Sequence, residues 1–201
     1  MELVLASTSP YRRVLLERLG VPFVTFKPDV DETPRPDEPA WALARRLAQA
    51  KAEAAQVLFP SSLIIGSDQV ATLDGALIGK PGNHARATAQ LRAVSGRCVD
   101  FYTGLCVLNT KTRQAHSEVV PYAILFRTLT ERDIEHYLRR EQPYDCAGSF
   151  KSEGLGTALF AKHLGDDPTA LIGLPLIRLV ALLQREGLDV LGDGSTTDTV
   201  R

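Results

Sequence analysis

Two side chains suited to acid–base and anion chemistry lie near each other in the middle of the chain. The run 63–70 starts as an apolar, β-branched strand and ends on a polar cluster that contains Asp68. Ligands of open α/β sheets sit outside the carboxyl ends of strands, so Asp68 is a candidate catalytic group unless it only opens a turn. The dipeptide Asp74-Gly75 predicts a hairpin, which would bring Lys80 back toward Asp68.

Further cations fall at the predicted ends of other elements. Arg12 and Arg13 lie in the first turn of a predicted helix, where two arginines indicate an anion ligand unless both are simply solvated. Lys51 lies on the apolar stripe of a long helix, so it either snorkels to water or projects into a pocket. Lys151 and Glu153 alternate in a glycine-rich segment, so they share one side of an extended chain unless the segment is a plain loop.

Carboxylates accompany these cations, and together they favour one kind of chemistry. Glu32 lies in a segment rich in proline and carboxylates, 28–39, which is typical of an ordered functional loop and equally of a solvated one. Cations that neutralise phosphate oxygens, with carboxylates that hold a metal and activate water, are what cleavage of a phosphoanhydride needs. Magnesium in particular is bound by a carboxylate or two together with substrate phosphates and water.

Several other chemistries lack their motifs. The spacing across 75–80 is too short for a Walker A loop, and Pro81 stands where Ser or Thr is needed. No G-x-G-x-x-G follows a predicted strand, and no G-x-S-x-G elbow is present. The 4 histidines show no metal-ligand spacing, and we interpret them as surface or core residues. The 3 cysteines form no C-x-x-C pair, so we expect reduced thiols rather than zinc or disulfides.

The composition limits the partners and the compartment. A chain of 201 residues with 44% hydrophobic and 23% charged residues is typical of a soluble globular protein. A net charge of −1 provides no basic field for nucleic acid or membrane, so phosphate binding must be local. The N-terminus does not resemble a signal peptide, and no apolar run approaches the roughly 18 residues of a membrane span. We therefore expect a cytoplasmic protein with no nucleic-acid polymer and no membrane as partner.

The hydrophobic pattern alternates between strands and helices. Strands are predicted at 2–6, 23–27 and 63–70 and in a hairpin over 97–127, and helices at 10–19, 39–58, 83–95, 128–140 and 176–186. Ser9 as N-cap with Pro10 after it begins the first helix, whose buried face is predicted at Val14, Leu15 and Leu19.

The other local signals concern a helix start, a proline and the end of the chain. Thr128 and Thr130 compete to cap the helix that follows them, and Thr128 with Glu131 fits a capping box. Pro121 predicts a break or an edge in the second strand of the long hairpin. The tail 193–201 is small and polar and is predicted to be disordered.

These motifs, taken in order, resemble a known family. The segment 5–13, Leu-Ala-Ser-Thr-Ser-Pro-Tyr-Arg-Arg, resembles the opening motif of the Maf family of nucleoside triphosphate pyrophosphatases. Later family motifs are resembled by Asp31-Glu32, Lys51, Ser67-Asp68-Gln69-Val70, Gly79-Lys80-Pro81, Ala147-Gly148-Ser149-Phe150-Lys151 and Gly173-Leu174-Pro175. The resemblance implies an α/β fold like that of inosine triphosphate pyrophosphatases: a mixed twisted sheet flanked by helices, with two lobes around a central cleft. It implies one catalytic domain over 1–192, often a homodimer, that hydrolyses a nucleotide to its monophosphate and pyrophosphate with a divalent metal (Mg, Mn or Co).

The resemblance also suggests a role for each candidate residue. We expect Asp68 to be the general base that activates water for attack at the α-phosphorus, with Lys80 and Lys151 beside it as catalytic cations. Glu32 and Asp68 are the expected metal ligands. The triphosphate is expected to be neutralised by Arg12, Arg13, Lys51, Lys80 and Lys151, with Ser7 and nearby amides on phosphate oxygens, while Tyr11, Gln69 and Glu153 read the base.

Two positions distinguish the main branches of the family. The dTTP/UTP branch usually has Ala-Asp-Thr where this chain has Ser67-Asp68-Gln69, and Gln where this chain has Glu153. The pattern here resembles the branch that acts on 7-methyl-GTP. Guanine N–H groups suit a carboxylate such as Glu153, and Tyr11, where the branch often has Trp, could stack on the cationic methylated ring. Two alternatives stay open: the same reaction on dTTP and UTP, and a non-catalytic nucleotide-binding regulator of cell division.

Overall fold

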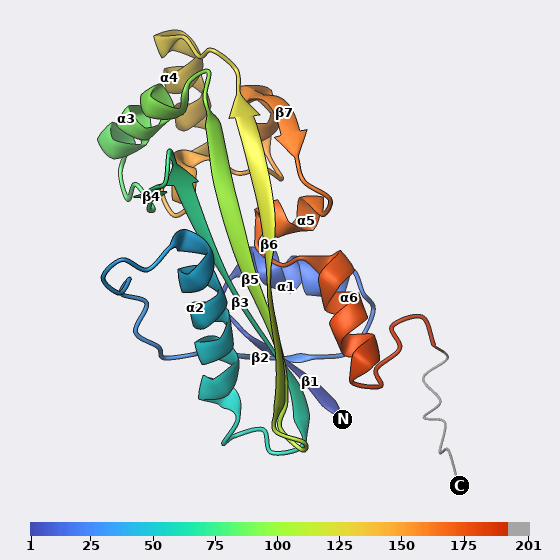
Figure 1. The fold of residues 1–201 in the computed structure, drawn as a ribbon. Helices are drawn as coiled ribbons and strands as arrows, with labels where there is room; N and C mark the ends of the chain where they lie inside the picture. Colours follow the sequence, from blue (N-terminus) through green and yellow to red (C-terminus); the bar gives the residue numbers. More distant parts are fainter. Residues whose placement is uncertain (193–201) are drawn as a thin grey trace, which may run out of the picture.

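A mixed seven-stranded sheet organises the computed structural model, which describes residues 1–192 (Figure 1). Its strands are β1 (Glu2–Ala6), β2 (Val24–Phe26), β3 (Ser62–Leu73), β4 (Ala76–Ile78), β5 (Cys98–Asn109), β6 (Gln114–Phe126) and β7 (Phe160–Leu164). They lie in the order β2-β1-β3-β5-β6-β7, with β4 paired to β3. The predicted α/β class is confirmed, and the predicted tail, 193–201, lies outside the described residues.

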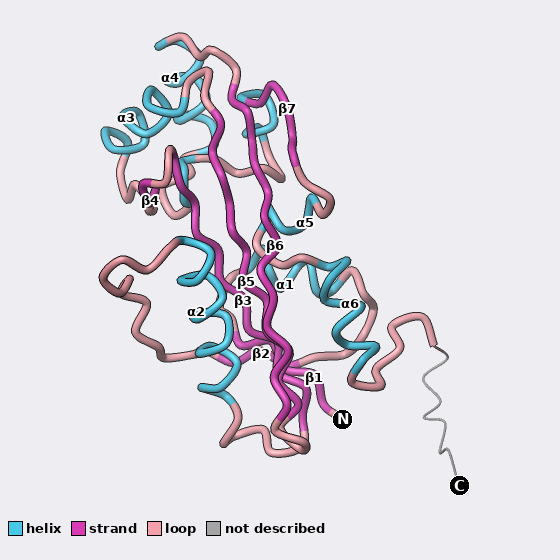
Figure 2. The backbone as a smooth tube through the Cα atoms, in the orientation of Figure 1, coloured by secondary structure: helices cyan, strands magenta, loops and turns pink. Residues whose placement is uncertain are grey.

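Helices cover both faces of the sheet and divide the molecule into two lobes. They are α1 (Pro10–Glu17), α2 (Ala40–Ala55), α3 (His84–Val94), α4 (Glu131–Glu141), α5 (Pro168–Ile172) and α6 (Leu176–Arg185), with short 3-10 turns η1 (Ala147–Ser149) and η2 (Leu155–Leu159). In one lobe α2 lies on one face of the sheet and α1 and α6 lie on the other, while α3, α4 and β7 form the second lobe (Figure 1). The long strands β3, β5 and β6 run through both lobes (Figure 2). None of the helices within 1–192 is long and apolar enough to cross a membrane.

The alternation of side chains along β3 assigns each face to a different set of helices. Ile64 packs with alanines of α2, whereas Leu63 and Ile65 pack with leucines of α1 and α6. The polar residues continue this alternation, so Asp68 lies on the α2 face and Ser67 and Gln69 lie on the other. Our prediction that the strand ends at this polar cluster was wrong: β3 continues to Leu73, because β5 pairs with it along its whole length.

The polar cluster instead coincides with a gap between two partner strands. β1 pairs with β3 in parallel as far as Gly66, and β4 pairs with it from Ala71 onward. Between these points, at 67–70, that edge of β3 has no partner strand in the described part of the chain. The predicted Asp74-Gly75 turn is confirmed as the β3–β4 connection, with Leu73 opposite Ala76. Asp68 is therefore placed just beyond the carboxyl end of β1, where ligands of α/β folds bind.

The local signals were confirmed in part. Ser9 caps α1, and Leu15 is buried as predicted, but Val14 is exposed and Leu16 is buried in its place. The capping box of α4 is formed by Thr130 and Asp133 rather than by Thr128 and Glu131.

Pro121 lies where the sequence indicated. The partner β7 reaches β6 only from Ala123 onward, so Pro121 lies on an edge stretch of β6, as predicted. The 3 cysteines, Cys98, Cys106 and Cys146, are free thiols.

Two glycines allow α2 to lie directly on the sheet. A Cβ atom at Gly104 would come within 2.1 Å of the carbonyl oxygen of Ala44, and one at Gly66 within 2.0 Å of that of Ala48. We expect Gly104→Ala to lower the free energy of unfolding by about 3 kcal/mol, because the helix must move away from its packed position. Urea denaturation measures this change. Gly79→Ala, which meets no atom within 4 Å, is the control, and equal stability of the two variants would contradict the argument.

Candidate active site

A cleft of about 460 Å³ opens at the unpartnered edge of β3, between the two lobes. It is lined by most of the residues predicted to act together: Ser7, Tyr11, Arg12, Glu32, Lys51, Asp68, Gln69, Lys80 and Glu153. These residues come from segments spread over much of the chain, so their convergence supports the predicted constellation. Arg13 and Lys151 do not line the cleft.

Two carboxylates converge on one ammonium at the centre of the cleft. Lys51 Nζ lies 2.5 Å from Asp68 Oδ1 and 2.6 Å from Glu32 Oε1. Lys51 lies on the buried stripe of α2 and therefore projects into the pocket, which was one of its two predicted environments. The side chains of Lys51 and Asp68 are 8% and 12% exposed, whereas that of Glu32 is 60% exposed. The charge of Asp68 is thus compensated inside the protein.

Glu32 is held ionised by the same ammonium. The hydrogen bond from Lys51 lowers the pKa of Glu32 against the opposing effect of burial, and the charges of Lys51, Lys80 and Arg12 lower it further. A lowered pKa means that this contact stabilises the fold above the ordinary pKa of a glutamate. Its contribution is lost as the pH falls through the lowered value. The loop 28–39 therefore remains tied to α2 at neutral pH.

The N-terminus of α1 forms one wall of the cleft. Ser7 Oγ accepts a hydrogen bond from Ser9 N at 3.1 Å, and Arg12 Nη1 lies 3.4 Å from the same oxygen. Arg12 Nε donates to the carbonyl oxygen of Gly173 at 2.7 Å, which orients the guanidinium. Burial lowers the pKa of Arg12, while the charges of Asp68 and Glu32 act in the opposite direction. A buried guanidinium at a helix N-terminus is suited to phosphate oxygens.

Arg13 was predicted to face the anion and does not. It pairs with Glu17 at 3.0 Å on the outer side of α1, and its side chain is 63% exposed. Successive helix residues point about 100° apart, and Arg13 lies one such step further around α1 from the cleft than Arg12. For Arg13, the solvated alternative is the one the structure supports.

Lys151 is directed away from the cleft. Its Nζ donates to the carbonyl oxygen of Glu141 at 3.1 Å, at the C-terminal end of α4, where a cation is favourable. The chain turns at 151–154 instead of running extended, because the Lys151 carbonyl accepts from the amides of Gly154 and Gly156. Lys151 and Glu153 therefore do not share one side, and only Glu153 reaches the cleft.

The other end of the cleft is aromatic and anionic, and much of it was not predicted. Tyr11, Phe101, Phe150, Leu171 and Ile172 supply apolar surface, and Asp145 and Cys146 join Glu153 at the rim. Burial raises the pKa of Tyr11, and the negative charges of Asp145 and Glu153 raise it further. Burial also raises the pKa of the Cys146 thiol to about 11. The only sequence signal for Asp145 and Cys146 was their place in a polar, irregular segment.

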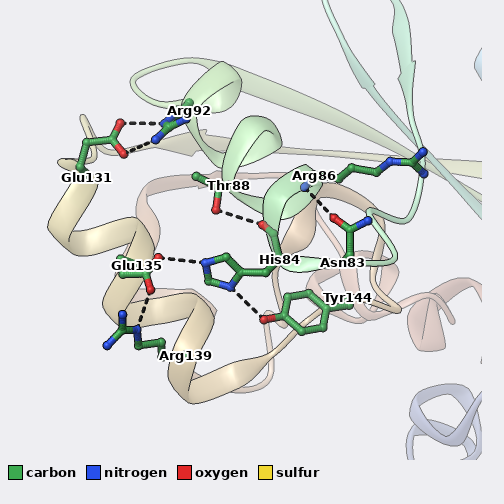
Figure 3. Close-up of polar contacts among 9 residues, drawn as sticks. All are labelled: Asn83, His84, Arg86, Thr88, Arg92, Glu131, Glu135, Arg139 and Tyr144. Atoms are coloured by element: carbon green, nitrogen blue, oxygen red, sulfur yellow. Dashed lines mark hydrogen bonds and ion pairs between the residues drawn. The ribbon is translucent and has the colours of Figure 1, made fainter.

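A polar cluster holds this rim in place (Figure 3). The ring of His84 lies 3.0 Å from the hydroxyl of Tyr144 and 2.9 Å from a carboxylate oxygen of Glu135. The carbonyl of Tyr144 also accepts from Gly82 N at 2.9 Å. The segment that carries Asp145 is thereby tied to α3, α4 and the loop after Lys80.

The comparisons with known proteins agree with this geometry. A family model described as Maf-like protein matches residues 2–186. The chain belongs to this family. Over 189 residues this Maf-like protein is 57% identical to the 7-methyl-GTP pyrophosphatase of Nitrosococcus oceani, covering 94% of this chain and 95% of the relative. Over 193 residues it is 52% identical to the 7-methyl-GTP pyrophosphatase of Colwellia psychrerythraea, covering 96% of each.

A solved structure shares the fold. The Staphylococcus aureus Ham1 protein superposes with a TM-score of 0.51 over 92% of this chain and 100% of the other, at 12% identity. At this identity the likeness concerns the fold alone. It confirms the predicted architecture of a mixed sheet flanked by helices.

The residues of this Maf-like protein fit a divalent metal that takes its other ligands from a substrate. Within residues 1–192 no group of three or more His, Cys, Asp or Glu side chains is placed to hold a metal by itself. Glu32 and Asp68 nevertheless converge on one positive charge and offer only oxygen. Magnesium is usually held by one or two carboxylates together with substrate phosphates, so this pair suits it.

Proposed function

We propose that this Maf-like protein is a nucleoside triphosphate pyrophosphatase that hydrolyses 7-methyl-GTP to 7-methyl-GMP and diphosphate. The observation that carries the proposal is the polarity of the cleft. Arg12, Lys51 and Lys80 gather around the carboxylates of Glu32 and Asp68, whereas Tyr11 lies among Cys146, Asp145 and Glu153. A triphosphate with a metal ion suits the first group, and a positively charged base suits the second. Relatives that are 52% and 57% identical over nearly the whole chain bear the name of this activity.

The cationic end binds the phosphates. Arg12, oriented by Gly173, and the amides at the start of α1 are placed for one group of phosphate oxygens, with Lys80 across the cleft. Charge on these oxygens grows as the phosphoanhydride breaks, so fixed cations stabilise the transition state. We include Lys151 among the cations only as an expectation from the family motif, since its ammonium is bound to Glu141.

Asp68 acts as the general base in this proposal. Its carboxylate takes a proton from a water molecule, whose oxygen attacks the α-phosphorus. The new bond joins that oxygen to phosphorus, and the bond to the bridging oxygen between the α- and β-phosphates breaks, so diphosphate leaves. Lys51 fixes the carboxylate by a 2.5 Å contact and keeps its rotamer directed into the cleft.

Glu32 and Asp68 are the residues that would hold a divalent metal, for which Mg, Mn and Co are candidates. Such an ion supplies positive charge to the phosphate oxygens as a Lewis acid. Adding EDTA should then abolish pyrophosphate release, and adding back the metal should restore it.

The base end selects the substrate. Tyr11 offers a face on which a ring can stack, and a cationic ring is attracted to it. The carboxylate of Glu153 accepts hydrogen bonds from guanine N–H groups and compensates the charge of the methylated ring. Both features favour 7-methylguanine over a neutral pyrimidine.

A substrate panel tests the proposal. Pyrophosphate release is measured with 7-methyl-GTP, GTP, dTTP and UTP, each with metal and with EDTA, and we expect 7-methyl-GTP to give the highest kcat/KM. A preference for dTTP and UTP would replace the substrate assignment and keep the reaction. If no nucleotide releases pyrophosphate but binding is retained, the result would refute the enzymatic activity and favour a nucleotide-binding regulator of cell division.

The two branch positions give a more specific prediction. We expect Gln69→Thr combined with Glu153→Gln to shift the ratio of kcat/KM for 7-methyl-GTP over UTP toward UTP by about tenfold or more, a difference of roughly 1.4 kcal/mol in transition-state binding. Steady-state kinetics on both nucleotides measure it. Glu2→Gln alone, exposed at the start of β1 and outside the cleft, is the control, and an unchanged ratio in the double variant would count against these roles.

We further propose that the protein works as a cytoplasmic homodimer, as the family resemblance suggests. Sedimentation at micromolar concentration tests the assembly, and a monomer there would refute it.

A further inference from the structure

The C-terminal end of the short helix α5 is held by side chains that come from the sheet. Gln69 Nε2 lies 2.8 Å from the carbonyl oxygen of Ala170, 2.9 Å from that of Leu171 and 3.2 Å from Thr103 Oγ1, so its amide nitrogen is directed to α5 and to Thr103. Thr103 Oγ1 donates to the carbonyl oxygen of Ala170 at 2.8 Å. Gly173 N also donates to the carbonyl oxygen of Ala170 at 3.0 Å, so the side-chain bonds add to the local cap and tie the end of α5 to the sheet.

The residue after α5 is held in the same way. The carbonyl oxygen of Gly173 accepts from Arg12 Nε at 2.7 Å, and Ser67 Oγ lies 2.8 Å from this oxygen and 2.8 Å from that of Gly104, between which its one hydrogen is shared. Gly173 has a φ of 114°, and a Cβ there would lie 3.3 Å from Arg12 Nε. The Gly173-Leu174-Pro175 motif thus joins the strand that carries Asp68 to the arginine that binds phosphate.

The same helix forms a wall of the cleft. Leu171 and Ile172 both line it, and Leu171 belongs to the same apolar cluster as Phe101 and Phe150. Ser67 and Thr103 are both fully buried and do not line the cleft, so neither of them can touch a bound nucleotide. Any influence of these two hydroxyls on substrate choice must pass through their partners, which are α5 and, for Thr103, also Gln69 Nε2 at 3.2 Å.

We propose that Ser67 and Thr103 are positioning residues for base recognition, which fix α5 so that Leu171 and Ile172 form the surface on which the base packs. This inference rests on the proposed function and concerns how that same cleft selects its base. Gln69 contributes to the same arrangement. Because its amide nitrogen is bound to α5, its side-chain oxygen is left to face the substrate, which suits a base that offers N–H groups. A base that stacks on a displaced wall binds less well, while the phosphates and Asp68 remain in place.

A matched pair of variants at Thr103 tests the inference. Thr103→Val keeps the shape and removes the hydroxyl, and we expect it to raise KM for 7-methyl-GTP about tenfold, because Ala170 loses one of its donors and Gln69 loses the hydroxyl that faces its amide. kcat should change less than twofold, and the preference for 7-methyl-GTP over UTP should shrink. Thr103→Ser restores the donor and should return KM to the wild-type value. A merely structural defect would lower the amount of active enzyme, and hence kcat, without moving KM.

Ser67→Ala is the second variant, and Ser62→Ala is its control. Ser62 is buried in the same strand, at the far end from the cleft, so the same change there should leave both KM values unchanged. Wild-type KM values and preference in both Ser67→Ala and Thr103→Val would overturn the inference. Failure of wild type to release pyrophosphate would instead refute the proposed function. In that event the dissociation constants of 7-methyl-GTP and UTP for the same variants decide the inference by the same criterion.

Discussion

Asp68→Asn is expected to leave a folded protein whose kcat for pyrophosphate release is lower by about 10² to 10⁴, the usual effect of removing a general base. The amide has the size of the carboxylate but cannot take a proton from water. Lys51 still faces Glu32 at 2.6 Å in this variant, so the buried ammonium keeps a charged partner and stability should be close to that of wild type. Because Asp68 is also a proposed metal ligand, kcat is compared at saturating substrate and saturating metal.

Single-turnover kinetics and circular dichroism on the same preparation measure activity and folding. Asp37→Asn is the control, because Asp37 is exposed and its φ of 55° suits Asn equally well. Wild-type turnover in Asp68→Asn would mean that another group is the base. Glu32→Gln then identifies whether the second carboxylate at this ammonium has that role.

The chemistry of this cleft could be predicted from residue types, but the direction of each side chain could not. Asp68, Lys80 and Glu32 were found because a carboxylate or an ammonium next to a turn signal is visible in the sequence. Lys151 and Arg13 were predicted on the same grounds and point elsewhere, since Glu141 and Glu17 bind them. Those partners are local and compete with a cleft that the sequence does not display.

The fold shows a similar limit. The length of β3 was underestimated because Ser67, Asp68 and Gln69 are residue types typical of the end of a strand. Inside the protein, however, the polar side chain of each has a hydrogen-bonding or ionic partner far away in the sequence. Gln69 binds the carbonyl of Ala170, 101 residues further along the chain. A polar cluster within a buried strand is tolerated only when such partners exist, and one sequence gives no sign of them. The apolar strands and helices need no such partners, which explains why their succession along the chain was predicted well.

The second large effect is expected at Lys51, because its ammonium compensates a buried carboxylate. Lys51→Met keeps the volume of the side chain and removes the charge, which leaves Asp68 without a partner in a site where its side chain is 12% exposed. Removing one member of a buried ion pair typically costs about 3 to 5 kcal/mol, so we expect a loss of this order in urea denaturation. Lys111→Met, in an exposed turn, should change stability by less than about 0.5 kcal/mol.

A double variant separates the two roles of this ammonium. In Lys51→Met with Asp68→Asn neither charge is buried alone, so most of the lost stability should return, while pyrophosphate release should stay at least as low as in Asp68→Asn. Recovery of stability without recovery of activity would show that the pair is retained for catalysis, since a neutral pair then supports the fold almost as well. Equal destabilisation in the single and double variants would contradict this, because it would mean that Lys51 stabilises α2 by packing rather than by its contact with Asp68.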